Sequence, residues 1–459
     1  MPQRGSSAER LHKPNHERLD HNLVERNTRS HLPFRFGDDL GKAFVRTWLS
    51  FGFATNSMVN LAGHANRVWF DDAVVATDDI GPFNAIDAAS QRWFVRCSGT
   101  LCRNRWELSM SGPVTGAIVF VLRFTLISGL LGGFVSVAVA EDDRPRLFVL
   151  TDIGGDPDDQ QSLIRLMVYC NEFQIEGLVA SASGTPGELK VATTKPELIR
   201  EIVSAYGKVR GNLIRHSEGW PETKLLLDVI RSGNPRRGLE HIGEGYDTEG
   251  SKFLIERVDA GSIDEPLNIT IWGGQTDLAQ ALWRVRQERG ADGLAEFVKR
   301  FRVYDIADQD GIADWMLAKF PGMFYILSKA KKGTDKRNAS FRGMYLTGDV
   351  ATTSREWIDA NVRSTGPLGA LYPTKTWTSP NPHGCMKEGD TPSWFFFLPQ
   401  GHNNPVDPSK PGWGGQFVQA ANGWYRDDRP SMDHREAVSR WRSEFQKDFA
   451  LRMSWCRNK

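Results

Sequence analysis

Residues 146–159 read RLFVLTDIGGDPDD, an apolar run followed at once by an acidic turn. The run from Arg146 to Leu150 is typical of a buried β-strand, and the residues after the turn are typical of an amphipathic helix. Four carboxylates fall in the turn itself: Asp152, Asp156, Asp158 and Asp159. Open α/β sheets bind ligands where the carboxyl end of a strand meets the amino end of a helix. Because like charges repel one another there, we expect a cation, Ca²⁺ or Mg²⁺, to hold the turn together.

The chain on either side of this turn alternates strands and helices. Arg146–Asp152, Gln160–Cys170 and Glu176–Ser181 read as a strand, a helix and a strand, which together make a βαβ unit. Further elements are predicted in the same alternation: helices at Lys195–Tyr206 and Pro221–Ile230, a strand at Leu267–Trp272, a helix at Thr276–Arg289, a strand at Arg302–Ile306 and a closing helical pattern at Met432–Met453. This order predicts an α/β protein with a mostly parallel central sheet flanked by helices in Rossmann-like layers, a single large domain after an N-terminal extension.

The composition is that of a globular protein with balanced charge. Of 459 residues 40% are hydrophobic, and 57 basic residues stand against 56 acidic ones, for a net charge of +1. Because the sequence has neither a concentrated basic helix nor an aromatic platform for RNA, it argues against a nucleic-acid polymer as partner. A small-molecule partner fits better, and association into a homo-oligomer stays open.

Residues 110–140 have the features of a secretory signal peptide. One basic residue, Arg123, precedes a mostly apolar stretch of 16 residues, Phe124–Val139, which ends in the small-x-small sequence Ala138-Val139-Ala140. A cleaved signal predicts a periplasmic or extracellular protein with no stable membrane partner. A retained anchor is the main alternative, because extending the apolar stretch back past Arg123 reaches the roughly 20 residues that span a bilayer. A buried helix is the third interpretation.

Residues 1–109 would precede that signal. They show no sustained hydrophobic period that builds a core, so we interpret them as a disordered extension and place the natural start of translation at Met110. If the apolar segment is instead a retained anchor, they form a cytoplasmic tail.

The cysteines of the main domain imply no disulfide framework. Cys170 falls on the apolar side of a predicted helix and reads as a core residue. A disulfide bond between Cys385 and Cys456 is an open alternative for an exported protein.

Four blocks, in order along the chain, resemble a known group of proteins. They are Val149-Leu150-Thr151-Asp152 followed by Pro157-Asp158-Asp159, then Glu176-Gly177-Leu178-Val179-Ala180, then Ile271-Trp272-Gly273-Gly274-Gln275-Thr276-Asp277-Leu278-Ala279, and last Glu388-Gly389-Asp390-Thr391-Pro392-Ser393. The part of the chain that they mark, roughly residues 145–456, resembles the nucleoside hydrolase superfamily. Within it the chain is most similar to the exported nucleoside hydrolase-like family whose members are often labelled cellulose-binding proteins.

The resemblance implies a calcium site at the bottom of a pocket above the sheet. Its ligands would be the carboxylates of Asp152, Asp159 and Asp390 and the backbone carbonyl of Trp272. The choice of calcium over magnesium is inherited from the resemblance, since oxygen ligands suit both cations. The implied reaction is hydrolysis of an N-glycosidic bond, with Asp152 as the base that activates water and Asp158 as the acceptor of a sugar hydroxyl.

The chain departs from the superfamily pattern at two points. The spacing from Asp152 to Asp158 is wider than usual, so that Asp156 competes with Asp158 for the role of hydroxyl acceptor. The superfamily often has a histidine before the late aspartate that protonates the leaving group, and this chain has Gly389 there. The acid for the leaving group is therefore missing or relocated.

Structural roles stay open for several of these residues. Asp158 and Asp159 fit a cap for the helix that follows, Gly273 and Gly274 fit a tight turn, and Asp390 alone fits a surface loop. Three polar residues follow the strand at Arg302–Ile306 and are either substrate contacts at the same sheet edge or a solvated turn: Asp308, Gln309 and Asp310.

The remaining candidates are aromatic or glycine-rich. His216, Trp220 and Trp413 either contact a substrate or pack in the interior. The loop Gly243–Gly250 has glycines at the wrong spacing for a dinucleotide fingerprint, so we reject a Rossmann cofactor and expect the loop to line the pocket.

Two functions stay open on the sequence. The first is an exported, calcium-dependent hydrolase that cleaves the N-glycosidic bond of a nucleoside-like substrate or a related glycosidic bond. The second is a non-catalytic protein that binds a saccharide, such as a cellulose-like chain, in the same pocket. The retained acidic residues favour the hydrolase, and the absent histidine favours the binding protein.

Overall fold

The computed structural model describes residues 142–184, 188–376, 378, 380–429 and 433–457, and before them only the backbone of six short strands. The chain divides into two units, Met1–Phe134 and Val135–Lys459. In the first unit, β1 (Ala43–Trp48) pairs with β2 (Ala54–Val59), and a four-stranded antiparallel sheet joins β3 (Arg67–Phe70), β4 (Ala73–Thr77), β5 (Arg92–Cys97) and β6 (Glu107–Ser109). The predicted signal segment, residues 110–140, lies outside the described residues. The assignment of residues 1–109 to an extension stays a prediction.

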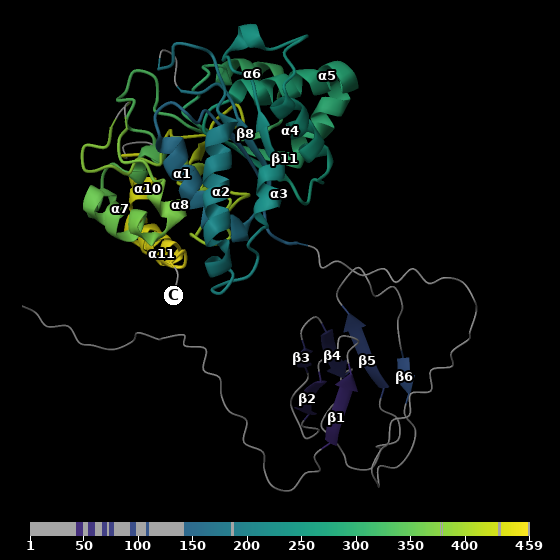
Figure 1. Cartoon of the computed structure of the whole chain (residues 1–459). Coiled ribbons are helices and arrows are strands. Elements are labelled where there is room, and N and C mark those ends of the chain that lie inside the picture. The colour runs from purple at the N-terminus through teal and green to yellow at the C-terminus, as the bar shows by residue number, and fades with distance from the viewer. Residues whose placement is uncertain are drawn as a thin grey trace, which may run out of the picture. The chain divides into compact units, whose positions relative to one another are not determined.

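The second unit is built on an eight-stranded sheet, of which Figure 1 labels β8 and β11, and β7 lies between β10 and β8. The strand order is β13 (Val418–Gln419), β14 (Tyr425–Arg426), β12 (Phe324–Ser328), β11 (Phe301–Ile306), β10 (Leu267–Ile271), β7 (Arg146–Thr151), β8 (Gln174–Ala180) and β9 (Ile230–Ser232). Every pair is parallel except β13 with β14. The mostly parallel α/β sheet predicted from the sequence is confirmed.

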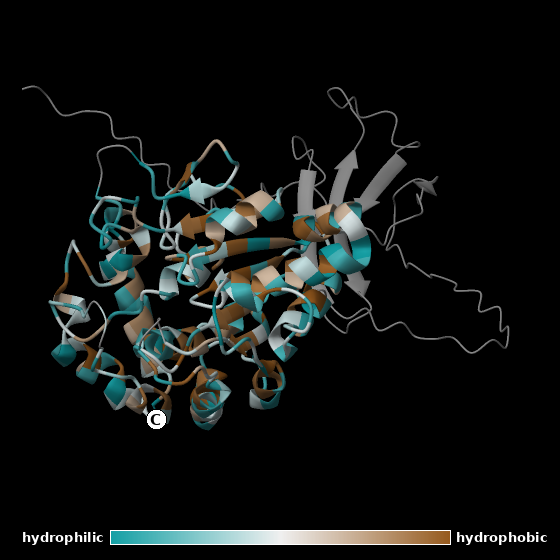
Figure 2. Ribbon diagram, turned by 90° about the horizontal axis from the view of Figure 1, so that it is seen from above, coloured by the Kyte–Doolittle hydropathy of each residue, from teal (hydrophilic) through white to brown (hydrophobic). Residues whose placement is uncertain are grey.

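The strand β7 is apolar on both sides because both faces of the sheet are covered. Leu147 and Val149 belong to one hydrophobic core, whereas Phe148 and Leu150 belong to a second core on the opposite face. All four side chains are fully buried. Successive residues of a strand point to opposite faces, so a continuous apolar run is what a doubly covered strand requires. In Figure 2 the hydrophobic strands run through the middle of this unit, with helices on either side.

Helices of two groups cover these faces. The first core includes residues of α1 (Asp158–Met167), α2 (Pro196–Leu213), α3 (Thr223–Asp228), α7 (Arg355–Asn361), α8 (Pro367–Ala370), α9 (Thr391–Phe395), α10 (Glu436–Ser439) and α11 (Arg442–Ser454). The second includes residues of α4 (Glu249–Asp259), α5 (Gln275–Phe297) and α6 (Ala313–Lys319). Short 3-10 helices complete the connections: η1 (Cys170–Glu172), η2 (Leu239–His241), η3 (Val298–Arg300), η4 (Ser340–Met344), η5 (Ala351–Thr353) and η6 (Arg363–Thr365). Among the described residues no helix is long and apolar enough to cross a membrane.

Several predicted boundaries differ from the structure. The helix predicted at Pro221–Ile230 ends at Asp228, and Ile230 instead begins the edge strand β9. The closing helical pattern splits into α10 and α11, and α5 runs past Arg289 to Phe297 although its backbone breaks at Gly290, where φ is 69°. The helix α4 was missed even though Thr248 and Ser251 form a capping box at its start.

The cysteine expectations are resolved for the described residues. Cys170, Cys385 and Cys456 are all buried and free, so the bridge between Cys385 and Cys456 is not formed. Cys170 lies in the first hydrophobic core, as its place on the apolar side of the helix predicted.

A buried ion pair joins α1 to the segment before α9. The Arg165 guanidinium on α1 donates to the carboxylate of Glu388, and both side chains are fully buried. Tyr372 donates its hydroxyl to the same carboxylate at 2.5 Å, and Arg165 also donates to Gln446 at 2.6 Å. Glu388 stands two residues before Asp390, so this pair fixes the acidic part of that segment against the sheet.

Replacing Glu388 by Gln should therefore destabilise the fold. Removing one partner of a buried ion pair leaves the other charge uncompensated, and the expected loss is about 3–5 kcal/mol in the free energy of unfolding. Denaturant unfolding measures it. The control is Asp228→Asn, which removes an exposed pair with Lys224 and should change stability by less than about 1 kcal/mol. A Glu388→Gln protein as stable as the parent would show that the pair does not anchor the segment.

Candidate functional site

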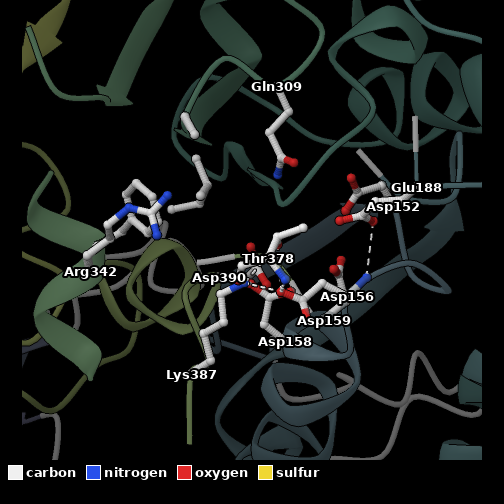
Figure 3. A pocket seen from close by; sticks show the side chains of 14 residues that line it. Asp152, Asp156, Asp158, Asp159, Glu188, Gln309, Arg342, Thr378, Lys387 and Asp390 are labelled. Atoms are coloured by element: carbon white, nitrogen blue, oxygen red, sulfur yellow. Dashed lines mark hydrogen bonds and ion pairs between the residues drawn. The ribbon is translucent and has the colours of Figure 1, made fainter. Parts of the chain in front are cut away.

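A cavity of about 220 Å³ opens at the carboxyl ends of the central strands (Figure 3). Its walls come from the turn after β7, the loop after β8, the end of β11, η4 and the segment before α9. The lining residues are Asp152, Asp156, Asp158, Asp159, Gly184, Glu188, Ile306, Ala307, Gln309, Phe341, Arg342, Thr378, Lys387 and Asp390. All four acids of the turn after β7 are among them, together with the late aspartate.

Glycines let the acidic turn fold tightly over the strand end. Gly154 has a φ of 110°, a conformation that L side chains rarely adopt. At Gly155 a Cβ atom would lie 2.2 Å from the Cα of Gly184, so the turn approaches the loop after β8 closely enough to exclude any side chain. The turn ends at Pro157, and no side chain caps α1 there. Asp158 and Asp159 begin α1 without serving as its cap.

Carboxylates from distant parts of the chain meet at the bottom of the cavity. Oxygens of Asp158, Asp159 and Asp390 all lie within 4.8 Å of one another. Asp390 enters from the segment before α9, and its side chain is buried. The sequence grouped Asp152, Asp159 and Asp390 as metal ligands, whereas the group that meets within this distance has Asp158 in the place of Asp152.

Burial and mutual repulsion raise the proton affinity of this cluster. Burial raises the pKa of Asp152 to about 6, although the charge of Arg237 opposes the shift. Burial, with repulsion from neighbouring carboxylates, raises the pKa of Asp158 and holds those of Asp159 and Asp390 well above their ordinary value. Each shift reports a charge that the folded chain does not fully compensate.

The donor set fits a divalent cation. One carboxylate oxygen of Asp390, Oδ2, is buried and has no hydrogen-bond partner within the described residues. Buried polar atoms in native proteins are nearly always satisfied, so such an oxygen indicates a missing partner. A hard cation such as calcium takes carboxylate and carbonyl oxygens, and Asp152, Asp158, Asp159 and Asp390 offer the carboxylates.

The end of β10 lies beside this cluster. At Gly273 a Cβ atom would lie 2.6 Å from the Cβ of Asp152, so only glycine allows this approach. The Trp272 carbonyl, predicted as a metal ligand, accepts a hydrogen bond from the side-chain amide of Gln309. A carbonyl oxygen has two lone pairs, so this bond leaves one for another partner. The Trp272 indole donates to the Ser393 hydroxyl at 2.9 Å, which ties β10 to α9.

Arg237, which the sequence analysis did not single out, braces Asp152 from behind the cavity. Its guanidinium contacts the Asp152 carboxylate at 2.8 Å and the Asp310 carboxylate at 3.1 Å. It also donates to the backbone carbonyls of Ala182 and Gly184. One side chain thus joins the turn after β7 to the loops after β8 and β11. The short strand β9, which precedes Arg237, was not predicted, so no sequence signal placed this residue at the sheet edge.

Lys387 neutralises the outer acids of the turn. Its ammonium contacts Asp156 and lies 3.2 Å from Asp158, and it donates to the Thr378 carbonyl at 2.8 Å. Thr378 also donates its hydroxyl to Asp156 at 2.7 Å. Asp156 is therefore tied to the 378–387 segment, whereas Asp158 reaches the group of Asp159 and Asp390. This arrangement favours Asp158 over Asp156 as the hydroxyl acceptor.

Only one of the three polar residues after β11 reaches the cavity. Asp308 accepts from the Ala313 amide at the start of α6, at 3.0 Å, and pairs with Lys329 at 2.6 Å. Asp310 accepts from both the amide and the hydroxyl of Thr276, and so holds the start of α5. Of the three, Gln309 alone lines the wall. The structure gives Asp308 and Asp310 structural partners in place of substrate contacts.

The aromatic candidates pack against neighbouring rings; Trp220 and Trp413 are buried, whereas His216 is exposed. His216 stacks on Trp455 with ring centroids 5.3 Å apart, and Trp220 is buried against Tyr206. Trp413 is buried against Phe395 and fills space, so it presents no open indole. None of them lines the cavity.

The glycine-rich loop predicted to line the pocket does not reach it. Asp247 in this loop accepts hydrogen bonds from Gln280 and Arg284 on α5, at 2.6 and 2.5 Å. No residue of Gly243–Gly250 is among those that line the cavity.

Comparison with known proteins gives the family. Residues 146–417 match the family model described as "Cellulose-binding Sde182, nucleoside hydrolase-like domain". The chain belongs to this family. It is also similar to a solved structure from Saccharophagus degradans, described as a nucleoside hydrolase-related hypothetical protein that is associated with carbohydrate metabolism. That match has 29% identity and a TM-score of 0.57, and covers 69% of this chain and 72% of the other. No curated protein matches the chain.

Calcium should stabilise the protein through the acidic cluster. A ligand that binds only the folded state adds about 2.7 kcal/mol to the free energy of unfolding at one hundred times its Kd. Asp390→Asn should remove most of this gain, because it replaces a charged ligand whose Oδ2 has no other partner. Thermal unfolding with and without calcium measures the effect. Asp308→Asn is the control and should keep the full gain. An equal gain in parent and Asp390→Asn proteins would place the cation elsewhere.

Proposed function

We propose that this chain is a calcium-dependent hydrolase of a small glycoside, acting on an N-glycosidic bond of the nucleoside type or on a related glycosidic bond. The observation that carries the proposal is the convergence of buried carboxylates from the turn after β7 and from Asp390 in one cavity. The size of the cavity supports a small ligand. About 220 Å³ lies below the range of roughly 300–1,000 Å³ that is usual for drug-sized ligands, which suits a single sugar ring.

The roles of the acids follow from their contacts. Calcium, when bound, lowers the pKa of water and coordinates sugar hydroxyls. Asp152 would accept the proton from the attacking water, since it lies at the strand end and is oriented by Arg237. Asp158 would accept a hydrogen bond from a sugar hydroxyl and so orient the ring. Gln309, at the cavity wall, would contact the same ring.

A non-catalytic saccharide-binding role is the second candidate, and two observations favour it. The position of the family's leaving-group acid is Gly389, which has no proton to give. Asp152 is engaged by an arginine, and an ion pair weakens a carboxylate as a base. The family's description as cellulose-binding supports the same reading. For either role we propose an exported protein, on the strength of the segment at 110–140.

Turnover separates the two candidates. Purine and pyrimidine ribonucleosides and a set of nitrophenyl glycosides are incubated with the protein in calcium and in chelator, and released base or nitrophenol is measured. The hydrolase predicts calcium-dependent release, and Asp152→Asn should lower kcat by about 10²–10⁴, the usual contribution of a general base. Asp314→Asn, at an exposed position on α6, should leave the rate unchanged.

Two outcomes would contradict the proposal, the first in the role of Asp152 and the second as a whole. Full activity in Asp152→Asn would remove Asp152 from the role of base. Saccharide binding by calorimetry, with no release from any glycoside, would establish the binding protein.

A further inference from the structure

The side of the cavity that faces the acidic cluster carries an arginine. Arg342 belongs to η4, and Figure 3 shows its guanidinium on the other side of the cavity from Asp152. The backbone of this segment is fixed, because Asp427 accepts hydrogen bonds from the amide and hydroxyl of Ser340, and the Phe341 amide donates to the Ser328 hydroxyl. Arg342 is therefore held on a rigid support rather than on a free loop.

Arg342 differs from the other arginine and the lysine at this site because the described part of the chain gives it no carboxylate. Lys387 is paired with Asp156 and Asp158, and Arg237 is paired with Asp152 and Asp310. Among the residues that the structure describes, the guanidinium of Arg342 makes one hydrogen bond, to the Tyr345 hydroxyl, and its buried Nε atom has no partner. A buried donor without a partner destabilises a fold by about 1–3 kcal/mol, so the Nε donor of Arg342 lacks an acceptor that a ligand could supply.

Gly389 lets the Phe341 ring, beside Arg342 on η4, lie close to the segment before α9. A Cβ atom at this position would lie 3.3 Å from the Phe341 ring and 3.6 Å from the Asp158 carboxylate. Any larger side chain would press against this ring. The Phe341 ring also lies 4.8 Å from the Arg342 guanidinium, and both residues line the cavity.

We infer that the ligand is a sugar that carries an anionic group, and that Arg342 binds this group while the acidic cluster binds the sugar hydroxyls. This inference rests on the proposed glycoside ligand and deepens it by naming its chemical class. A guanidinium offers a planar fork of donors that matches a carboxylate or a phosphate in two parallel hydrogen bonds. Neutral cellulose-like sugars have no group that satisfies this fork as well. The anionic group thus fixes which end of the ring faces η4.

The test compares sugars that differ in one group. Calorimetry in the presence of calcium measures the binding of methyl glucoside and methyl glucuronide, and of methyl galactoside and methyl galacturonide, each pair differing only in a CH₂OH or a carboxylate at C6. Glucose 6-phosphate forms a further arm that distinguishes phosphate from carboxylate. An anionic member should bind at least about tenfold more tightly than its neutral partner, the effect of one charge-assisted hydrogen-bond pair.

Variants assign the preference to the residue. Arg342→Gln should abolish the preference for the anionic sugar while neutral sugars bind as before, which also reports that the cavity is folded. Arg342→Lys, which keeps the charge without the fork, should retain part of it. Arg337→Gln, at an exposed position, should retain all of it.

The binding and turnover results distinguish failure of this inference from failure of the proposed hydrolase. Equal affinity within both sugar pairs, no binding of any anionic sugar at millimolar concentration, or a preference that survives Arg342→Gln would overturn the inference. Anionic preference without turnover would leave this inference standing while the proposed hydrolase fails. Turnover of neutral glycosides alone would do the opposite.

Discussion

The structure depends on placing mutually repelling carboxylates in a buried cavity at one edge of a parallel sheet. The fold compensates two of these charges with its own basic side chains: Arg237 pairs with Asp152, and Lys387 pairs with Asp158. Asp159 and Asp390 have no such ion pair among the described residues, and their pKa values are held well above the ordinary value, first by burial and then by neighbouring carboxylates. A group in this state takes up either a proton or a metal ion. The distribution of paired and unpaired acids therefore marks the centre at which a cation would bind.

The late aspartate reaches this centre because several buried contacts hold the segment before α9. Arg165 fixes Glu388 from α1, and the Trp272 indole fixes Ser393 from the end of β10. Asp390 lies between those two anchors. Repulsion among the acids pushes the segment away from the turn after β7, and the anchors oppose this push with contacts that are fully buried. Stability and site geometry are thus coupled through the same short segment.

The sequence was informative where a residue's role follows from local pattern. The strand β7 was predicted well because a strand covered on both faces needs an uninterrupted apolar run. Asp159 and Asp390, which meet in one group with Asp158, were grouped with Asp152 through motifs that stand in a fixed order. The edge strands β9, β13 and β14 are only two or three residues long, too short to show a period.

The sequence did not identify the arginine and the lysine that pair with these acids, for a different reason. Arg237 and Asp152 are 85 residues apart, and Lys387 and Asp156 are 231 apart. A single basic residue in a loop has no pattern that names its partner. Asp308 and Asp310 show the converse difficulty, because an acid after a strand serves equally well as a ligand contact or as the cap of the next helix. The structure shows that Asp310 accepts a hydrogen bond at the start of α5 and that Asp308 accepts one at the start of α6.

The opposite charges on the two walls of the cavity would orient a bound ligand. Acids at the bottom bind cations and hydroxyl donors, whereas Arg342 on η4 binds acceptors, so a symmetric neutral sugar would satisfy one wall and leave the other unsatisfied. Gly389 lies between these walls, since a Cβ atom there would lie 3.3 Å from the Phe341 ring and 3.6 Å from the Asp158 carboxylate. A histidine there, as in the superfamily pattern, would press against the Phe341 ring. In the binding mode that we infer, a pendant group at this wall is recognised by the Arg342 guanidinium through its negative charge, while the position of the family's leaving-group acid holds a glycine that has no proton to give.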